Sequence, residues 1–371
     1  MFKEEVFHKI FNSVKNGEEY CFIDNKYKTW ILPYKNMKQA TEMFSSYSRN
    51  GNLIKYIFPY IKWSRMARKK AGCKRITVSL NTEITGIIER YVDKPYQCAV
   101  YFGNLDTEQN YKATIQVFHK KETLLYIKIS NALVVKDAFE REKKALENLR
   151  QKGIEKLPMA VGIEKAGQWD ALIQRPENGK LSICNVFGDR QWRFLENLYK
   201  ATVCECDYHS TDLYGHLKYL SDIVKNNGFY KKEMIEKALI CVDRYLEQEV
   251  TEFSFAHGDF TPWNMKETET GIYVYDFEYC MNTTVPFMDY FHYICQREIM
   301  KNENDITRVI QIFEEDKETI YQYIENPEMV FVIYLLFIIS FYVKRNNGKA
   351  NENSGRFWFR MSLLEQLLQK M

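Results

Sequence analysis

The sequence lacks the cysteine patterns that mark disulfide scaffolds and zinc sites. Its nine cysteines are an odd number and are scattered, with no C-x-x-C pair. Cys204 and Cys206 are separated by one residue, a spacing that suits neither a zinc knuckle nor a redox pair. We therefore expect reduced thiols in a cytoplasmic protein.

Strong net charge and long apolar segments are also missing. The net charge of +3 does not by itself indicate nucleic-acid binding. The first residues, "MFKEEVFHKIF", lack the apolar core of a signal peptide. The longest uncharged apolar run, Met329–Val343, is shorter than the roughly 20 residues that span a bilayer. We expect that run to form a buried helix of a soluble protein.

What the chain does contain is an ordinary globular composition, 46% hydrophobic with 15% aromatic residues, arranged in three segments. Residues 1–80 form an N-terminal extension, in which "YCFIDNKYKTWILPY" predicts a hairpin around a DNK turn. Two helices are expected to follow, over 37–48 and 53–70. The extension closes with a basic run, residues 62–75, that contains no acidic residue.

Residues 81–175 are rich in predicted strands, and residues 176–371 are mostly helical. The strand patterns are "QCAVYFGN", "YKATIQVFHK", "LLYIKIS", "PMAVGIEKA" and "WDALIQR". A short helix is expected from Thr82 and a longer one over 137–151, with Asp137 as its N-cap. The expected class is α+β, a small antiparallel sheet followed by a larger helical part.

The segment "HGDFTPWN" places an aspartate and an asparagine, Asp259 and Asn264, five positions apart, and Asp276 follows at the end of a short apolar strand. Phosphoryl transfer needs alignment and charge neutralisation more than covalent help from the protein. One aspartate can accept the proton of an attacking hydroxyl. An asparagine and a second aspartate can hold Mg²⁺, which prefers hard oxygen ligands. The spacing is that of a kinase catalytic loop and its metal-binding aspartate.

A second pair of charged residues lies upstream. Lys128 falls inside an apolar strand, where a lysine without a partner is costly. Glu142 shares a helix face with Leu146 and Leu149, so it is predicted to point inward. The two residues are therefore expected to pair. The alternative is a lysine that reaches water from an edge strand and a glutamate on the surface.

"HGDFTPWN" followed by "YVYDFEYC" resembles the catalytic core of the aminoglycoside phosphotransferase and choline kinase superfamily, which has a protein-kinase-like fold. The resemblance covers residues 82–371 in element order and is sharp over 255–290. It implies a two-lobed fold that binds ATP and Mg²⁺ between its lobes. The roles it implies are: catalytic base, Asp259; magnesium ligands, Asn264 and Asp276; phosphate contact and its orienting partner, Lys128 and Glu142; structural support, His257 and Asp289.

The sequence departs from protein kinases because no G-x-G-x-x-G motif lies between the first two strands. "FGNLDTEQNYK" offers a single glycine, Gly103, as the candidate phosphate loop. The stretch "IQRPENGK" is the candidate hinge, where the backbone near Gln174 and Arg175 would face adenine. Pro176 has no N–H to offer there.

The resulting interpretation is a cytoplasmic, ATP- and Mg²⁺-dependent phosphotransferase that acts on a hydroxyl of a small molecule or a glycan. Two alternatives remain open: a catalytically inactive kinase-fold protein that serves as a binding or coat component, and a protein kinase. The basic run at 62–75 is either a solvated helix face or a contact for a polyanionic substrate or an anionic membrane surface. Nucleic acid is not expected as a partner.

Overall fold

The computed structural model describes residues 2–24, 28–41, 56–70, 72–103, 111–177, 182–184, 186–225, 229–301, 305–352 and 354–371. The chain divides into two compact units. Unit 1 comprises Met1–Arg150 and Lys156–Leu181, and unit 2 comprises Gln151–Glu155 and Ser182–Met371.

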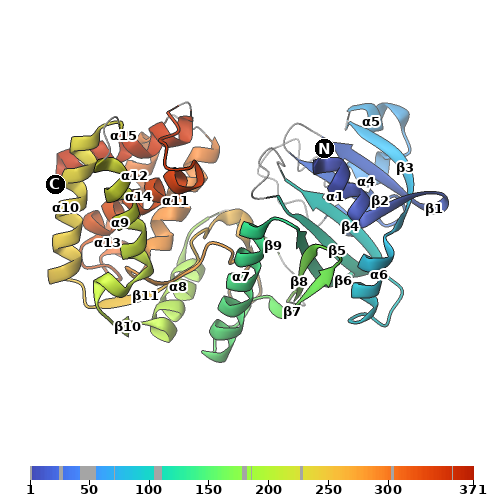
Figure 1. Cartoon of the computed structure of the whole chain (residues 1–371), viewed down its shortest axis with the longest axis horizontal. Coiled ribbons are helices and arrows are strands. Elements are labelled where there is room, and N and C mark those ends of the chain that lie inside the picture. Colours follow the sequence, from blue (N-terminus) through green and yellow to red (C-terminus); the bar gives the residue numbers. More distant parts are fainter. Residues whose placement is uncertain are drawn as a thin grey trace. The chain divides into compact units, whose positions relative to one another are not determined.

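Unit 1 is built on one antiparallel sheet of eight strands in the order β3-β1-β2-β4-β5-β6-β8-β7 (Figure 1). Its strands are β1 (Phe11–Asp24), β2 (Thr29–Pro33), β3 (Cys73–Leu80), β4 (Gln97–Phe102), β5 (Ala113–His119), β6 (Glu122–Ser130), β7 (Met159–Ala166) and β8 (Trp169–Arg175). Its helices are α1 (Phe2–Ile10), α2 (Met37–Ala40), α4 (Phe58–Ile61), α5 (Arg65–Lys70), α6 (Thr82–Glu89) and α7 (Leu133–Gln151).

The N-terminal extension contributes three of these strands. β1 and β2 form the predicted antiparallel hairpin, and two residues of its predicted DNK turn, 25 and 26, lie outside the described residues. β2 then pairs with β4, from Thr29 opposite Phe102 to Ile31 opposite Val100. The extension thus shares one sheet with residues 81–175. The division of the chain at residues 80 and 175 remains a prediction.

Apolar side chains on both faces of the sheet explain why helices cover both. On one face Val6 and Ile10 of α1 and Ile84 of α6 join one buried cluster with strand residues such as Ile127 and Ile129. The opposite face carries Leu172, which packs against Val135 and Phe139 of α7. Lys128 is the register partner of Leu172, so it belongs to the α7 face.

Two predictions about helix boundaries are wrong. The helix predicted over 137–151 begins at Leu133, and Asp137 lies inside it rather than at its N-cap. The Lys136 N–H already donates to the carbonyl of Ala132, and burial of Val135 against the sheet favours this extra turn. Where the sequence predicts a single helix over 53–70, the described residues form two short ones, α4 and α5, separated by a turn at residues 62–64. Pro59 lies in the first turn of α4, where proline is tolerated. Residues 42–55 of both predicted helices lie outside the described part of the chain.

Unit 2 is mainly helical, with short strands that hold its central loops. Its helices are α8 (Asp189–Thr202), η2 (Tyr208–Ser210), α9 (Asp212–Lys225), α10 (Lys232–Gln248), η3 (Pro262–Asn264), α11 (Met288–Lys301), α12 (Thr307–Glu315), α13 (Lys317–Ile320), α14 (Pro327–Arg345) and α15 (Gly355–Lys370). Its strands are β9 (Ser182–Ile183), β10 (Cys204–Glu205), β11 (Glu252–Ala256), β12 (Met265–Glu267), β13 (Ile272–Val274) and β14 (Met281–Thr284). An antiparallel sheet followed by a larger helical part confirms the predicted α+β class.

Helix α14 contains the apolar run Met329–Val343. It is the one helix of the described residues that is long and apolar enough to cross a membrane, and 78% of its most apolar window is buried within the protein. Figure 1 shows α14 among the other helices of unit 2. It contacts α9, α10, α11 and α15. Its apolarity is therefore used in the core of this unit, as the sequence predicts.

Candidate active site

The segment "HGDFTPWN" follows strand β11 and turns sharply at Gly258. The backbone of Gly258 has a φ of 79°, in the left-handed region that favours glycine. A Cβ atom at this position would lie 2.0 Å from the carbonyl oxygen of Tyr279. Only glycine fits this close approach, so the turn that presents Asp259 depends on it.

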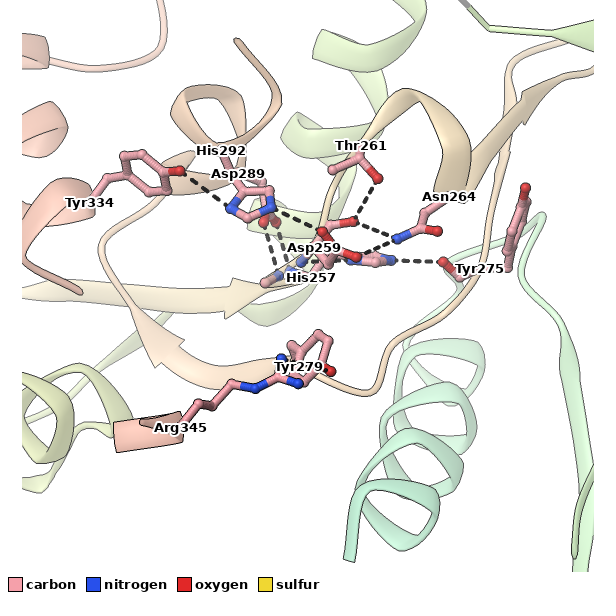
Figure 2. A network of polar contacts seen from close by, with 11 residues as sticks. His257, Asp259, Thr261, Asn264, Tyr275, Tyr279, Asp289, His292, Tyr334 and Arg345 are labelled. Carbon is pink, nitrogen blue, oxygen red and sulfur yellow. Dashed lines mark hydrogen bonds and ion pairs between the residues drawn. The ribbon is translucent and has the colours of Figure 1, made fainter. Parts of the chain in front are cut away.

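Asp289, at the start of α11, holds the backbone of that turn. Its two carboxylate oxygens accept the N–H of His257 at 2.7 Å and the N–H of Gly258 at 3.0 Å (Figure 2). Burial raises the pKa of the Asp289 carboxyl, while the hydrogen bonds from the backbone amides of His257 and Gly258 act in the opposite direction. A buried carboxylate that accepts two backbone N–H groups fixes this loop to α11. The structural-support role of Asp289 in a working enzyme remains a prediction.

His257 links the turn to the segment that carries Asp276. Its Nδ1 accepts the N–H of Asp259 at 3.2 Å, and its Nε2 lies 3.1 Å from the carbonyl oxygen of Tyr275. Since an amide only donates and a carbonyl only accepts, the imidazole carries its proton on Nε2. The fully buried ring of His257 therefore ties the backbone of Tyr275, the residue before Asp276, to the backbone of Asp259.

The β12–β13 pairing brings Asn264 and Asp276 to the same end of a hairpin. Met265 lies opposite Val274, and the N–H of Tyr275 donates to the carbonyl of Asn264 at 3.0 Å. Asp276 comes next, half-buried, with a φ of 72°. Non-glycine residues are uncommon in this region of backbone space, although aspartate is among those enriched there, and such residues cluster at functional sites.

Asn264 also contacts Asp259 directly. Its side-chain NH₂ donates to the Asp259 Oδ2 at 2.7 Å and to the Asp259 carbonyl at 3.0 Å. Both bonds use the nitrogen, so they leave the amide oxygen of Asn264 directed elsewhere. The structure thus gathers the three residues that the sequence assigns to base and metal ligands, Asp259, Asn264 and Asp276, around one turn and one hairpin of unit 2.

The donor set fits a magnesium ion. An amide oxygen from Asn264 and a carboxylate from Asp276 are hard oxygen donors, and Mg²⁺ is commonly held by few protein ligands plus water and phosphate oxygens. Over the part of the chain that the structure describes, no cluster of three or more His, Cys, Asp or Glu side chains is placed to hold a metal ion.

One residue at this site escaped the sequence analysis. His292, on α11, places its Nε2 3.0 Å from Oδ1 of Asp259, and its side chain is 5% exposed. Behind it, the hydroxyl of Tyr334 on α14 lies 3.5 Å from the His292 Nδ1 (Figure 2). In the sequence, His292 stands in "MDYFHYIC", among apolar and aromatic residues, where a histidine is taken for part of the core. The sequence feature that points to His292 is its position one helical turn after Asp289.

Unit 1 contains the second predicted pair, Lys128 with Glu142. The Lys128 Nζ lies 2.8 and 2.7 Å from the two oxygens of Glu142, and the side chains are 9% and 0% exposed. Gln174 donates to the same carboxylate through Nε2 at 3.0 Å. The structure therefore brings together three predicted residues, Lys128 from β6, Glu142 from α7 and Gln174 from β8, in one buried polar cluster.

Two other predicted residues of unit 1 do not join that cluster. Arg175 is exposed at the end of β8, and its Nη2 donates to the carbonyl of Tyr91 at 3.5 Å. Gly103 is half-buried at the end of β4. Most of the candidate phosphate loop, residues 104–110, and the end of the candidate hinge, residues 178–180, lie outside the described residues. The nucleotide-binding roles of Gly103, Gln174 and Arg175 remain predictions.

Comparison with protein-family models and with curated proteins found no match. Solved structures do match. A thermostable mutant of the aminoglycoside phosphotransferase APH(4)-Ia in its apo form superposes with a TM-score of 0.50 at 10% identity, covering 78% of this chain and 98% of that one. The choline kinase LicA from Streptococcus pneumoniae gives a TM-score of 0.49 at 14% identity, covering 78% of this chain and 98% of that one.

A putative fructosamine-3-kinase from Haemophilus somnus gives 0.46 at 15% identity, covering 75% of this chain and 92% of that one. At these identities the likeness concerns the fold alone. The fold that the sequence resemblance predicts is confirmed: this chain has the two-lobed, protein-kinase-like fold of the aminoglycoside phosphotransferases.

Proposed function

We propose that the protein is an ATP- and Mg²⁺-dependent phosphotransferase that moves the γ-phosphate to a hydroxyl of a small molecule or a glycan, with Asp259 as general base. The observation that carries the proposal is the fixed Asp259 carboxylate. Asn264 holds one of its oxygens, and the backbone of its loop is tied to Asp289 and Tyr275. Its side chain is still 24% exposed, so a substrate hydroxyl can reach it.

In this proposal Asp259 orients the acceptor hydroxyl and takes its proton as the hydroxyl oxygen bonds to the γ-phosphorus. The bond between that phosphorus and the β–γ bridging oxygen breaks, and ADP leaves. A carboxylate suits the task because the proton is transferred late, once the hydroxyl oxygen has begun to bond to phosphorus. The fixed side chain lowers the entropy cost of alignment, which is the larger part of catalysis in phosphoryl transfer. The bond to Asn264 also keeps the amide oxygen of that residue turned away from Asp259.

Asn264 and Asp276 are proposed to hold Mg²⁺. When bound, the ion would neutralise charge on the phosphates of the nucleotide. Lys128 is proposed to contact the phosphates, with Glu142 holding its ammonium group through both carboxylate oxygens. Gly103 and the backbone near Gln174 and Arg175 are proposed to contact the nucleotide. Cytoplasmic location belongs to the same proposal.

ATP with Mg²⁺ is expected to raise the melting temperature of the protein, because a ligand that binds only the folded state stabilises it. At a hundredfold excess over Kd the stabilisation is about 2.7 kcal/mol. Differential scanning fluorimetry with ATP and Mg²⁺, compared with ATP and EDTA, measures how much of the rise in melting temperature depends on the metal. Asp276→Ala should lose that part and keep the part seen in EDTA.

The exposed Asp305 offers a matched control, since it lies in a loop and its carboxylate accepts the N–H of Thr307 at 3.0 Å. Asp305→Ala should retain the full response to ATP and Mg²⁺. A melting temperature that ignores ATP in the presence of Mg²⁺ would contradict the proposed function. A full response in Asp276→Ala would instead contradict only the metal assignment.

A further inference from the structure

His292 contacts the carboxylate of Asp259 on the side opposite to Asn264. The His292 Nε2 lies 3.0 Å from Oδ1, whereas the Asn264 nitrogen lies 2.7 Å from Oδ2. A carboxylate held at both oxygens has its plane fixed as well as its position. Figure 2 shows the two donors reaching Asp259 from separate elements, α11 and the turn at η3.

The surroundings of His292 determine which nitrogen carries the proton. An ionised carboxylate only accepts hydrogen bonds, so Nε2 must be the donor. Nδ1 can then accept from the hydroxyl of Tyr334, 3.5 Å away. Burial raises the pKa of Tyr334, which keeps that hydroxyl protonated and able to donate. Tyr334, His292 and Asp259 thus form a chain of polar contacts in which His292 donates to the carboxylate.

The same helix supports the active loop twice. Asp289 holds the backbone of His257 and Gly258, and His292, three residues later, holds the side chain of Asp259. Residues three apart lie on one face of a helix, so α11 fixes both the path of the loop and the direction of its carboxylate.

We propose that His292 is a positioning residue that fixes the Asp259 carboxylate for proton transfer from the acceptor hydroxyl. This inference rests on the proposed function. It assigns no proton transfer to His292 itself. The imidazole acts through Asp259.

The test compares His292→Leu, which removes the donor, with His292→Gln, whose amide can still donate. His292→Leu should lower kcat for ADP release about 100-fold, since misplacing a catalytic group by about 1 Å costs that much. KM for ATP should stay unchanged, and His292→Gln should recover a large part of kcat. The exposed His209, which contacts Asp207 and Glu247, gives a matched control, and His209→Gln should keep the full rate.

The melting temperature and ATP binding of each variant are measured alongside, so that a folding defect is recognised. If the unmodified protein releases ADP and His292→Leu keeps kcat within twofold, the inference is overturned while the proposed function stands. An equal loss in His292→Leu and His292→Gln would also overturn it. If the unmodified protein releases no ADP, the proposed function fails, and the inference falls with it.

A separate observation concerns the surface of unit 1 formed by residues 56–70 and 72–75, which we call the aromatic–basic surface. Phe58 and Pro59 are buried, and Phe58 joins the cluster of Tyr34, Met37 and Leu32. The neighbouring large apolar side chains face outward with 44–72% exposure: Tyr56, Ile57, Tyr60, Ile61, Trp63 and Met66. Six exposed apolar side chains in one short segment mark an interaction site rather than scattered surface residues.

The cations of the aromatic–basic surface divide into two groups. Lys62 is buried and donates to the carbonyl of Lys35. Arg68 donates to the carbonyls of Lys62 and Trp63, and Arg75 pairs with Glu19, so these three cations have partners within the fold. The exposed remainder are Arg65, Lys69, Lys70 and Lys74. No acidic residue occurs between Lys62 and Arg75 in the sequence. The surface therefore presents positive charge beside apolar groups.

This mixture fits an anionic lipid bilayer. Tryptophan and tyrosine favour the level of the headgroups, aliphatic side chains favour the acyl boundary, and basic residues are attracted to anionic lipids. A single-stranded nucleic acid would use the aromatic rings and the cations, but it has no use for exposed isoleucine and methionine. We propose that the aromatic–basic surface binds the face of a membrane that contains anionic lipid.

The full-length protein is mixed with vesicles of phosphatidylcholine, or of phosphatidylcholine with 30% phosphatidylglycerol, and sedimented. We expect binding to the anionic vesicles only, weakened by 0.5 M salt. Lys69→Glu/Lys70→Glu and Trp63→Ala should each lower binding at least tenfold. Lys225→Glu/Lys237→Glu, with the same change of charge on α9 and α10 of unit 2, should bind as the unmodified protein does.

Absence of binding to the anionic vesicles would overturn the proposal, as would equal binding to neutral vesicles. A single-stranded RNA is tested in parallel. If RNA competes with the vesicles for the protein, and competes equally well for Trp63→Ala, the surface binds polyanions in general. That result would also overturn the bilayer proposal. None of these measurements depends on phosphotransferase activity.

Discussion

Asp259→Asn is expected to lower the rate of ADP release by about 10²–10⁴-fold, the usual contribution of a general base. The amide has nearly the shape of the carboxylate and can still accept the hydrogen bond from His292 through its oxygen. It cannot take up the proton of an acceptor hydroxyl. The new NH₂ group faces the NH₂ of Asn264, which loses its side-chain acceptor, so the change removes the proposed base together with one hydrogen bond of the site.

The measurement is a coupled assay of ADP release, first without an added acceptor and then with a panel of hydroxyl compounds. ATP with Mg²⁺ should still stabilise Asp259→Asn, because Asp276 is unaltered and the NH₂ of Asn264 keeps its hydrogen bond to the backbone carbonyl of residue 259. The exposed Asp207 provides a matched control: its carboxylate accepts the N–H of His209, and Asp207→Asn should keep the full rate. A rate in Asp259→Asn within a few-fold of the unmodified protein would contradict the role of Asp259.

The same experiment addresses the alternative of an inactive kinase-fold protein that serves as a binding or coat component. Such a protein would bind nucleotide or a partner and would release no ADP with any acceptor. Its melting temperature could still rise with ATP. Turnover that depends on Asp259 is therefore the observation that separates the two hypotheses, and thermal stabilisation alone does not separate them.

The sequence predicts those parts of the site that depend on local spacing. Asp259 and Asn264 lie in one short loop, and a hairpin of two short strands brings Asp276 next to them. Glu142 is predicted to face inward because Leu146 and Leu149 share its helix face, and all three side chains are fully buried. The inward direction of Glu142 follows from the spacing of apolar residues along its own helix, so it can be predicted without knowledge of tertiary contacts.

His292 could not be predicted in the same way. It lies 33 residues from Asp259 in the sequence, and the contact exists only because Asp289 anchors α11 to the loop. Nor does any local pattern say that β2 pairs with β4, which joins the N-terminal extension to the sheet. The sequence also predicts the wrong start for α7, because that start depends on a contact distant in sequence. Val135 extends the helix since it packs against Leu172, a residue of strand β8.

Lys128→Met is expected to lower the free energy of unfolding of the protein by about 3–5 kcal/mol, the cost of leaving one charge of a buried ion pair without its partner. Glu142 is fully buried, so its carboxylate cannot turn to water when the ammonium is removed. For a unit of this size the loss corresponds to a fall in melting temperature of about 6–20 °C. Lys143 on the same helix provides the control, since its pair with Glu147 is partly exposed and Lys143→Met should cost less than about 0.5 kcal/mol.

Lys128→Met/Glu142→Leu should recover most of that stability, because replacing both members of a buried pair by apolar residues is often neutral. The remaining deficit should come from Gln174, whose side-chain NH₂ loses its acceptor Glu142 and stays buried. Under the proposed function the double variant remains unable to bind phosphates with Lys128, so its ADP release should stay low although its fold is restored. Recovery of stability together with activity would show that the pair is only structural. If the double variant is no more stable than Lys128→Met, the stability lost in Lys128→Met does not come from leaving the buried charge of Glu142 unpaired.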